Sequence, residues 1–402
     1  MSEAKNISSV KRESCTGCGA CMKSCPRNEI VFEDDEEGFP SPKILAEACV
    51  DCGLCRQVCP AITVPEKHGI QKAYAIQLTD PDALKKSTSG GFFTALSREI
   101  FARGGVVYGC VWDEKYNAVI RRAENEAETE PMRGSKYVWS WAGDTYPEIK
   151  KELESGRTVL FTGLSCQVAG LKNYLRKSYD NLYTVGFLCG GSPSPYAFRE
   201  YLKTITKNVP LDALDLKFRD KDAGGVGVHI TYNTSKRRKC QTYISNPYYY
   251  AFYTKVTVRR SCFDCPYRYE QRVDDITFGD YWEVEKYHSE FDVSAGVSAV
   301  LVNTEKGAEL FDALKSQLAF SEAKCRKIAA ANNLTLGEAR KVFKVPGFRD
   351  DFFSVMREQG WTKASKKYLR NKKRFVLWIK TKTPKRLWAG MKRLRKTIAG
   401  KD

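Results

Sequence analysis

Residues 15–26 read CTGCGACMKSCP, and residues 49–60 read CVDCGLCRQVCP. Both stretches have the spacing Cys-x2-Cys-x2-Cys-x3-Cys-Pro, with glycine among the intervening residues. Thiolates three residues apart in a tight loop can bind the corner irons of one 4Fe-4S cluster, and small residues let backbone amides approach the cluster sulfurs. A zinc site uses paired Cys-x2-Cys elements with four ligands in all, and two complete four-cysteine runs disfavour that interpretation. The spacing therefore predicts two 4Fe-4S clusters.

The order of the two runs also predicts which cysteines share a cluster. In two-cluster domains with this spacing, the fourth cysteine of each run binds the other cluster. This N-terminal part, about residues 8–66, resembles the dicluster ferredoxin module. The acidic residues 33–37 between the runs are expected to form a solvated loop. The predicted ligands are Cys15, Cys18, Cys21 and Cys59 for the first cluster and Cys25, Cys49, Cys52 and Cys55 for the second.

Charge and cysteine content indicate the cellular setting. The chain has 402 residues with 66 Lys and Arg against 48 Asp and Glu, a net charge of +18, of which +15 lies in residues 361–402. The first residues lack the apolar core of a signal peptide, and the basic tail has no apolar run that could cross a bilayer. We therefore expect a cytoplasmic protein whose fifteen cysteines serve metal ligation or catalysis rather than disulfides.

A serine and glycine turn opens the body of the chain. Residues 87–91 read STSGG, after a predicted strand at 73–78 and before a predicted helix at 92–102. Free amides at this helix start could hold a phosphate or pyrophosphate through Ser89, Gly90 and Gly91. A serine N-cap with glycines is also an ordinary helix start, and the two interpretations carry equal weight.

A second unit has the pattern strand, helix, strand. The strands are predicted at 158–161 and 182–188, with a helix between them that ends near Leu175. Such a βαβ unit places its ligand at the carboxyl ends of the strands. Cys166 and Cys189 both fall at those ends.

The seven cysteines outside the two runs divide into two sets. Cys166 and Cys189, together with the pair Cys262-x2-Cys265, supply the four thiolates that a third 4Fe-4S cluster needs. The alternative, at even odds, is that Cys166 and Cys189 are small buried residues and that Cys262 and Cys265 form a redox or zinc element. The other cysteines, Cys110, Cys240 and Cys325, are predicted to be core residues.

An ordered set of motifs gives the body a family resemblance. It resembles the coenzyme F420 hydrogenase/dehydrogenase beta-subunit family over about residues 70–320, including members with a fused N-terminal dicluster ferredoxin. The motifs are Ser89-Gly90-Gly91, GSKY at 134–137, FTGLSCQ at 161–167, LCGG at 188–191, FRDK at 218–221, CFDC at 262–265 and FGDYW at 278–282.

This resemblance implies a FAD-containing oxidoreductase that exchanges a hydride with a deazaflavin and passes single electrons to iron-sulfur clusters. It also implies that Cys166, Cys189, Cys262 and Cys265 hold a cluster next to the flavin. Members occur in bacteria not known to make coenzyme F420, often beside surface-polysaccharide genes, so another reduced carrier and surface-polysaccharide metabolism stay open. No catalytic residue is assigned. The candidate cofactor contacts are Ser89, Gly90, Gly91, Lys136, Thr162 and Gly163.

The basic tail, residues 361–402, interleaves cationic residues with apolar ones, among them three tryptophans. A basic amphipathic helix with Trp and Leu on one face binds the interface of an anionic membrane. Pro384 is expected to divide the tail into helices at about 362–382 and 385–398. Peripheral attachment to the inner face of the membrane is favoured over docking on a partner protein, and nucleic-acid binding is disfavoured because nothing else in the chain reads bases.

Together these patterns predict a mixed α+β and α/β chain: a small ferredoxin-like dicluster domain, a mixed α/β flavin-type body and a helical basic tail. The expected boundaries are 1–66, 70–155 and 156–325 for the ferredoxin domain and the two family parts, and 326–402 for the helical C-terminal region. The leading hypothesis is an iron-sulfur flavoprotein oxidoreductase with a redox partner protein or a deazaflavin-type carrier. The competing hypothesis is a non-catalytic electron-transfer or adaptor subunit that wires a partner enzyme at the membrane face.

Overall fold

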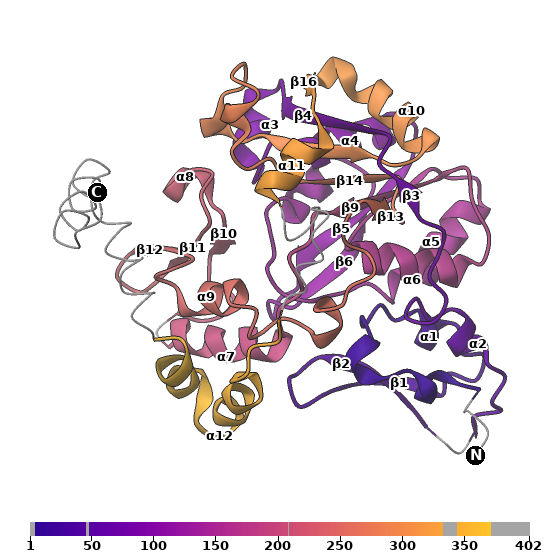
Figure 1. Cartoon of the computed structure of the whole chain (residues 1–402), viewed down its shortest axis with the longest axis vertical. Coiled ribbons are helices and arrows are strands. Elements are labelled where there is room, and N and C mark those ends of the chain that lie inside the picture. The colour runs from indigo at the N-terminus through magenta and orange to yellow at the C-terminus, as the bar shows by residue number, and fades with distance from the viewer. Residues whose placement is uncertain (1–4, 46–47, 208, 333–343, 371–402) are drawn as a thin grey trace, which may run out of the picture.

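The computed structural model describes residues 5–45, 48–207, 209–332 and 344–370 (Figure 1). The N-terminal domain has two short helices, α1 (Ala20–Lys23) and α2 (Leu54–Gln57), and an antiparallel hairpin of β1 (Ile30–Asp34) and β2 (Pro40–Ile44). Each helix starts at a glycine in the left-handed region, where a residue with a Cβ would be strained. The two cysteine runs therefore form the same loop-helix unit twice.

A nine-stranded mixed sheet forms the centre of the body. Its four middle strands run parallel, and antiparallel strands extend it on both sides. The sheet combines strands from before and after residue 156, so both family parts build one body. In spatial order the strands are β16 (Leu318–Glu322), β4 (Lys72–Leu78), β15 (Ser298–Val302), β14 (Ile276–Asp280), β9 (Leu182–Phe187), β8 (Val159–Thr162), β5 (Val106–Trp112), β6 (Ala118–Ala123) and β7 (Ser140–Trp141).

Helices cover both faces of this sheet. Val159 and Phe161 of β8 point to one face and Leu160 to the other, because side chains alternate along a strand. One face packs on α5 (Thr145–Glu154) and α6 (Ser165–Leu175). The other face packs on α4 (Phe92–Ala102) and α10 (Glu305–Leu314), with α3 (Pro81–Lys86) at its edge. The mixed α/β class predicted from the sequence is confirmed.

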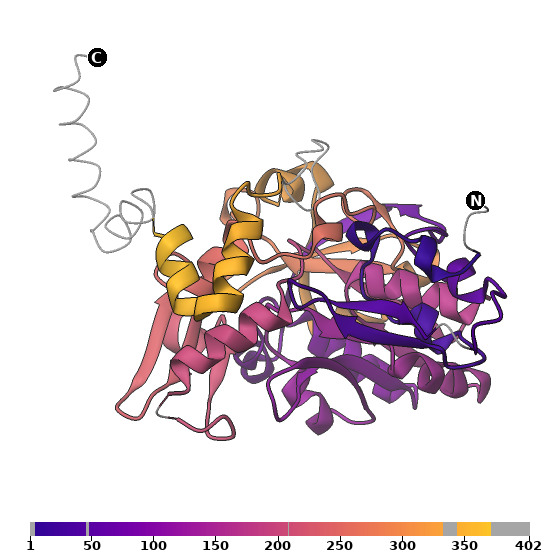
Figure 2. The same cartoon turned by 90° about the horizontal axis from the view of Figure 1, so that it is seen from below.

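A second, smaller sheet stands beside the body and was not predicted from the sequence. It consists of β10 (Leu216–Phe218), β11 (His229–Asn233) and β12 (Arg238–Thr242), all antiparallel. An aromatic core joins it to its helices, with the Tyr201 and Tyr248 rings stacked 5.2 Å apart between centroids. Figure 2 shows these helices together on one side of the molecule: α7 (Pro195–Ile205), α9 (Pro247–Tyr253) and α12 (Arg349–Tyr368).

The remaining elements connect these parts. A two-residue antiparallel pair joins β3 (His68–Gly69) to β13 (Gln271–Arg272). The short helix α8 (Lys221–Gly224) follows β10, and α11 (Cys325–Ala331) follows β16. Cys240 lies exposed on β12, so the prediction that it is a core residue was wrong. Its neighbours in the strand are also mostly exposed, because β12 is an edge strand of the small sheet.

The described start of the basic tail belongs to the body. Trp361 is 2% exposed and Leu369 is fully buried, both in the aromatic core beside α7. The apolar side chains of residues 361–402 were predicted to face a membrane; for Trp361 and Leu369 this prediction was wrong, because both pack in the core of the body. The predicted helices beyond residue 370 lie outside the described residues. Within the described ranges, no helix combines the length and the apolar character needed to cross a membrane.

Candidate functional site

Three small cavities are each lined by four cysteines: two lie within the N-terminal domain, and the third lies in the body, where Thr16 of the N-terminal domain joins its lining. They are called the first, second and third cysteine cavities. The first measures about 190 Å³, whereas the second and third are narrow, about 20 and 30 Å³, so their fit to a cluster rests on the donor set rather than on free volume. The cysteines are Cys15, Cys18, Cys21 and Cys59 in the first, Cys25, Cys49, Cys52 and Cys55 in the second, and Cys166, Cys189, Cys262 and Cys265 in the third.

This grouping agrees with two predictions from the sequence. The fourth cysteine of each run lies with the other run, and the four candidate cysteines of the body lie together. Among the described residues, no three His, Cys, Asp or Glu side chains converge closely enough for a single metal ion. A 4Fe-4S cluster needs no such convergence, because each thiolate binds a different iron. That the cysteines bind iron stays a prediction, and the structure supplies the grouping.

The cysteine loops hold their thiols in buried, hydrogen-bonded positions. Burial raises the pKa of Cys18 to about 12 and that of Cys59 to about 11. In the third cavity burial likewise raises the pKa of Cys262 to about 12. Thiols with such pKa values are protonated at neutral pH, so metal binding must displace their protons.

Backbone amides and cations surround the third cysteine cavity. The Gly191 amide donates to Cys189 Sγ over 3.3 Å, and Gly191 adopts φ +108°, a conformation that favours glycine. Arg259 and Arg268 line the cavity. Lys255 is close enough to interact electrostatically with Cys189 and Cys262. Four thiolates would therefore meet a positive environment.

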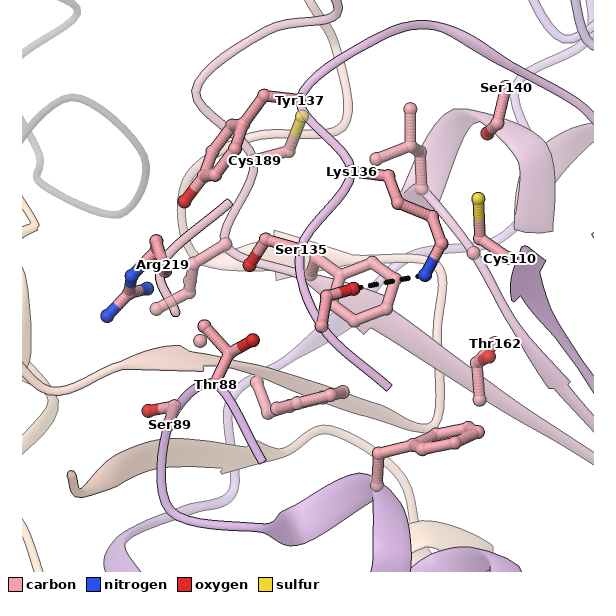
Figure 3. Close-up of a pocket in the computed structure, with 18 of the residues that line it drawn as sticks. Thr88, Ser89, Cys110, Ser135, Lys136, Tyr137, Ser140, Thr162, Cys189 and Arg219 are labelled. Atoms are coloured by element: carbon pink, nitrogen blue, oxygen red, sulfur yellow. Dashed lines mark hydrogen bonds between the residues drawn. The ribbon is translucent and has the colours of Figure 1, made fainter. Parts of the chain in front are cut away.

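A larger cavity of about 310 Å³ opens at the carboxyl ends of the parallel strands β8, β9 and β14. This is the edge at which sheets of this kind bind ligands. Figure 3 shows Lys136, Cys110 and Thr162 gathered at one end, with Arg219 and Ser89 at the other. Aromatic rings, including Phe92, Phe278 and Tyr137, supply its apolar walls.

Lys136 is fixed by its own loop. Its Nζ lies 3.2 to 3.3 Å from the carbonyl oxygens of Met132, Arg133 and Gly134, and burial lowers its pKa (Figure 3). Cys110 lies near enough to interact with this charge. One end of the cavity thus carries a buried lysine whose position is set by three backbone acceptors.

Of the three turn residues predicted to contact a phosphate, Ser89 and Gly91 line the large cavity but Gly90 does not. Thr162 and Gly163 also line it. The Gly90 amide instead donates to Ser298 Oγ over 2.9 Å, and a Cβ on Gly90 would come 2.4 Å from the Ile76 carbonyl oxygen. Gly90 is therefore required for close packing against the sheet.

Lys221 ties the same turn to α3 and to the segment before β15. Its Nζ donates to the carbonyl oxygens of Leu84, Ser89 and Ala295 over 2.8, 2.9 and 2.6 Å. Burial, followed by the charge of Arg219, lowers the pKa of Lys221 to about 8. The shape of this end of the cavity thus depends on one partly buried ammonium group.

Arg219 was not among the candidate residues, although it stands in the FRDK motif. It is 4% exposed and adopts φ +57°, which is strained for a side chain of this size. It forms an ion pair with Asp280 and lies over the Trp282 ring, 5.1 Å from its centroid. Its Nε is buried without a hydrogen-bond partner in the part of the chain that the structure describes. Only the motif was visible in the sequence, because the pairing joins residues 61 apart.

The four cavities lie next to one another in a series. The large and third cavities share five lining residues, and the third and first share Thr16. Cys21, Cys55 and Cys59 pack in one buried cluster, which joins the first and second cavities. The residues common to the large and third cavities are Leu164, Gln167, Cys189, Gly191 and Ser192.

Comparison with known proteins identifies two domains. Residues 14–62 match the 4Fe-4S dicluster domain, and residues 156–326 match the C terminus of the coenzyme F420 hydrogenase/dehydrogenase beta subunit. A search of curated proteins finds no match. A solved structure of the F420-reducing [NiFe] hydrogenase complex from Methanosarcina barkeri matches with 18% identity and a TM-score of 0.46, over 73% of this chain and 92% of that one.

The two domain matches agree with the motifs quoted from the sequence. The predicted resemblance is therefore confirmed, and with it the assignment to an oxidoreductase family. The chain thus combines a 4Fe-4S dicluster domain at residues 14–62 with a domain at residues 156–326 that is related to the C terminus of the coenzyme F420 hydrogenase/dehydrogenase beta subunit.

Proposed function

We propose that the chain is an iron-sulfur flavoprotein oxidoreductase. In this proposal a flavin in the large cavity exchanges two electrons with a deazaflavin or another reduced carrier, and three 4Fe-4S clusters carry single electrons. The observation that carries the proposal is the series of neighbouring cavities, in which Cys189 lines both the large and the third cavity and Thr16 lines both the third and the first. A bound flavin supplies the exchange between two-electron and one-electron chemistry.

The large cavity fits FAD by the character of its lining. Its aromatic walls suit a flat ring system, and the buried Arg219 Nε and Thr94 Oγ1 have no hydrogen-bond partner within the described ranges. Orphaned buried donors are costly unless a ligand satisfies them. Ser89, Gly91 and Arg219 would face the phosphates, and Lys136, Thr162 and Gly163 would line the other end.

The third cysteine cavity fits a 4Fe-4S cluster by its donor set. Four thiols line it, the Gly191 amide donates to one of them, and backbone hydrogen bonds at Ser192 and Tyr267 reach Cys262 and Cys265. Amide and cationic groups around cysteine sulfur stabilise the negative charge of such a cluster.

The chain's own residues position these groups and exclude water. The first cavity is mostly buried, whereas Cys52 of the second is exposed. The second cavity is therefore proposed as the exit toward a redox partner protein. A non-catalytic adaptor remains the competing hypothesis, but an adaptor has no use for the large cavity.

Two finer proposals concern the setting of the reaction. The organic substrate could be a glycan precursor in surface-polysaccharide metabolism, with the direction of flow reversed. The basic residues after 370, which lie outside the described ranges, are proposed to hold the chain on an anionic membrane surface. Both rest on the sequence and its resemblance, and neither is needed for the electron path.

Anaerobic photoreduction tests the path. In the wild-type chain, illumination of the bound flavin with EDTA as electron donor should produce reduced clusters, seen by electron paramagnetic resonance. The double variant Cys262→Ser, Cys265→Ser should keep the flavin and the iron of the ferredoxin domain. Its ferredoxin clusters should be reduced at least tenfold more slowly than those of the wild type. Equal rates in both proteins would overturn the proposal.

A control separates this result from general damage. Cys240 is exposed on β12 and lies outside all four linings. Cys240→Ser should therefore match the wild-type rate. A slow rate in this control as well would mean that cysteine replacement itself impairs the protein.

A further inference from the structure

Arg259 lies between the first and third cysteine cavities. Its Nε donates to the Cys15 carbonyl oxygen over 2.7 Å, and its Nη2 donates to the Pro40 carbonyl oxygen over 2.9 Å. The same Nη2 lies 3.6 Å from Cys15 Sγ. Arg259 also lines the third cavity, so one side chain touches the walls of two proposed cluster sites.

The backbone of Arg259 belongs to the third cavity. Its amide donates to the Ser192 carbonyl oxygen over 2.9 Å, and its own carbonyl accepts from the Cys262 amide over 3.0 Å. The residue is 4% exposed. The loop that carries Cys262 therefore reaches across to Cys15 through a single buried arginine.

The remaining guanidinium nitrogen faces the loop of the first cavity. Nη1 is buried with no hydrogen-bond partner in the described part of the chain. It lies against Gly17, where an added Cβ would come within 2.9 Å of it. A hydrogen bond or positive charge at a cluster sulfur stabilises the reduced, more negative cluster and raises its reduction potential. Burial strengthens this effect because the local dielectric is low.

We propose that Arg259 is a positioning residue that raises the reduction potential of the first ferredoxin cluster and holds this cluster next to the third cavity. The inference rests on the proposed function, because it needs a cluster bound by Cys15. It assigns to one body residue the task of tuning a cluster in another domain.

The test is a potentiometric titration of the full chain, followed by electron paramagnetic resonance. Arg259→Gln removes the charge but keeps a polar side chain. The midpoint potential of the first cluster should fall by about 59 mV. For a one-electron couple this shift lowers the ratio of reduced to oxidised cluster about tenfold at a fixed potential. The other midpoints should stay. Unchanged midpoints with unchanged iron would overturn the inference.

Two further variants keep the result interpretable. Arg260→Gln removes the neighbouring arginine, whose Nε donates to Glu37 Oε1 over 3.0 Å rather than to the Cys15 loop, and it should leave all midpoints unchanged. Arg259→Lys keeps the positive charge but loses the planar guanidinium that reaches several acceptors at once. The midpoint potential of the first cluster should therefore fall less in this variant than in Arg259→Gln. If Arg259→Gln does not retain iron, the fall in Arg259→Lys is the test, and its absence contradicts the inference.

These outcomes are separate from the fate of the proposed function. An iron content near eight per chain would show that the third cluster is absent. The first cluster would still be present, and its midpoint potential could still be measured. An Arg260→Gln shift as large as that of Arg259→Gln would assign the effect to domain docking and overturn the role of Arg259.

Discussion

Arg349 and Glu37 form a buried, two-pronged ion pair between residues 312 apart in the chain. Arg349 Nε donates to Glu37 Oε1 over 2.9 Å, and Nη2 pairs with Oε2. Arg349 also donates to the Val256 carbonyl oxygen over 2.8 Å, and Arg260 donates to the same Glu37 carboxylate. The start of α12 and the loop before Cys262 therefore meet at the turn of the β1–β2 hairpin.

This pair should dominate the docking of the N-terminal domain. Glu37→Gln leaves the buried Arg349 charge uncompensated, and removal of one partner of such a pair costs about 3 to 5 kcal/mol. Urea unfolding of the full chain should show a loss in this range. The control Glu33→Gln breaks an exposed pair with Lys43 on the same hairpin and should cost below about 1 kcal/mol. Similar losses in the two variants would contradict the docking role.

Arg219 should govern cofactor affinity in the large cavity. Arg219→Gln removes the guanidinium and leaves the Asp280 carboxylate to repel an anionic ligand. Loss of one charge-assisted hydrogen bond predicts about tenfold weaker FAD binding, measured by fluorescence on flavin-depleted protein. Arg199→Gln breaks an exposed pair with Asp34 outside this cavity and should leave the affinity unchanged. An unaltered dissociation constant in Arg219→Gln would remove this residue from the site.

Lys221 should make stability depend on pH. Its pKa in the fold is about 8, below the usual 10.5, so the folded chain holds fewer protons than the unfolded chain between these values. Stability from this group therefore rises as pH increases from about 8 toward 10.5, and is lost as pH falls through 8. Relative to Lys221→Met, the wild type should gain about 1 kcal/mol between pH 7.5 and 9.5, a value reduced because the ammonium is partly exposed. Parallel stability curves would contradict the shift.

Membrane binding by the basic tail is best tested by deleting only part of residues 361–402. Trp361 and Leu369 pack in the body, so deletion should begin at residue 371. The full chain should float with anionic vesicles and lose this binding without residues 371–402, since each Lys or Arg near an anionic surface contributes about 1 kcal/mol. Equal binding to neutral vesicles would argue against an electrostatic mechanism.

Local patterns in the sequence predicted much of the fold. The helix expected at 92–102 occurs as α4, and the predicted strand-helix-strand unit is β8, α6 and β9. Both depend on residues close together in the chain. Cysteine spacing likewise predicted the groups of the first two cavities, because in two-cluster domains with this spacing the fourth cysteine of each run joins the other group.

Features that depend on distant pairs could not be predicted in this way. The acidic loop was expected to be solvated, yet Glu37 is 7% exposed because Arg349 neutralises it. Trp361 looked like part of a membrane stripe until α12 placed it against Tyr201. Arg219 and Arg259 gain their surroundings only when loops more than 60 residues apart meet.

Iron and flavin content of the anaerobically purified full chain tests the central claim most directly. Three clusters and a flavin predict about twelve irons and one flavin per chain. The Cys262→Ser, Cys265→Ser variant should hold about eight irons, while Cys240→Ser should keep about twelve. About eight irons and no flavin in the wild type, or unchanged iron in the double variant, would contradict the account.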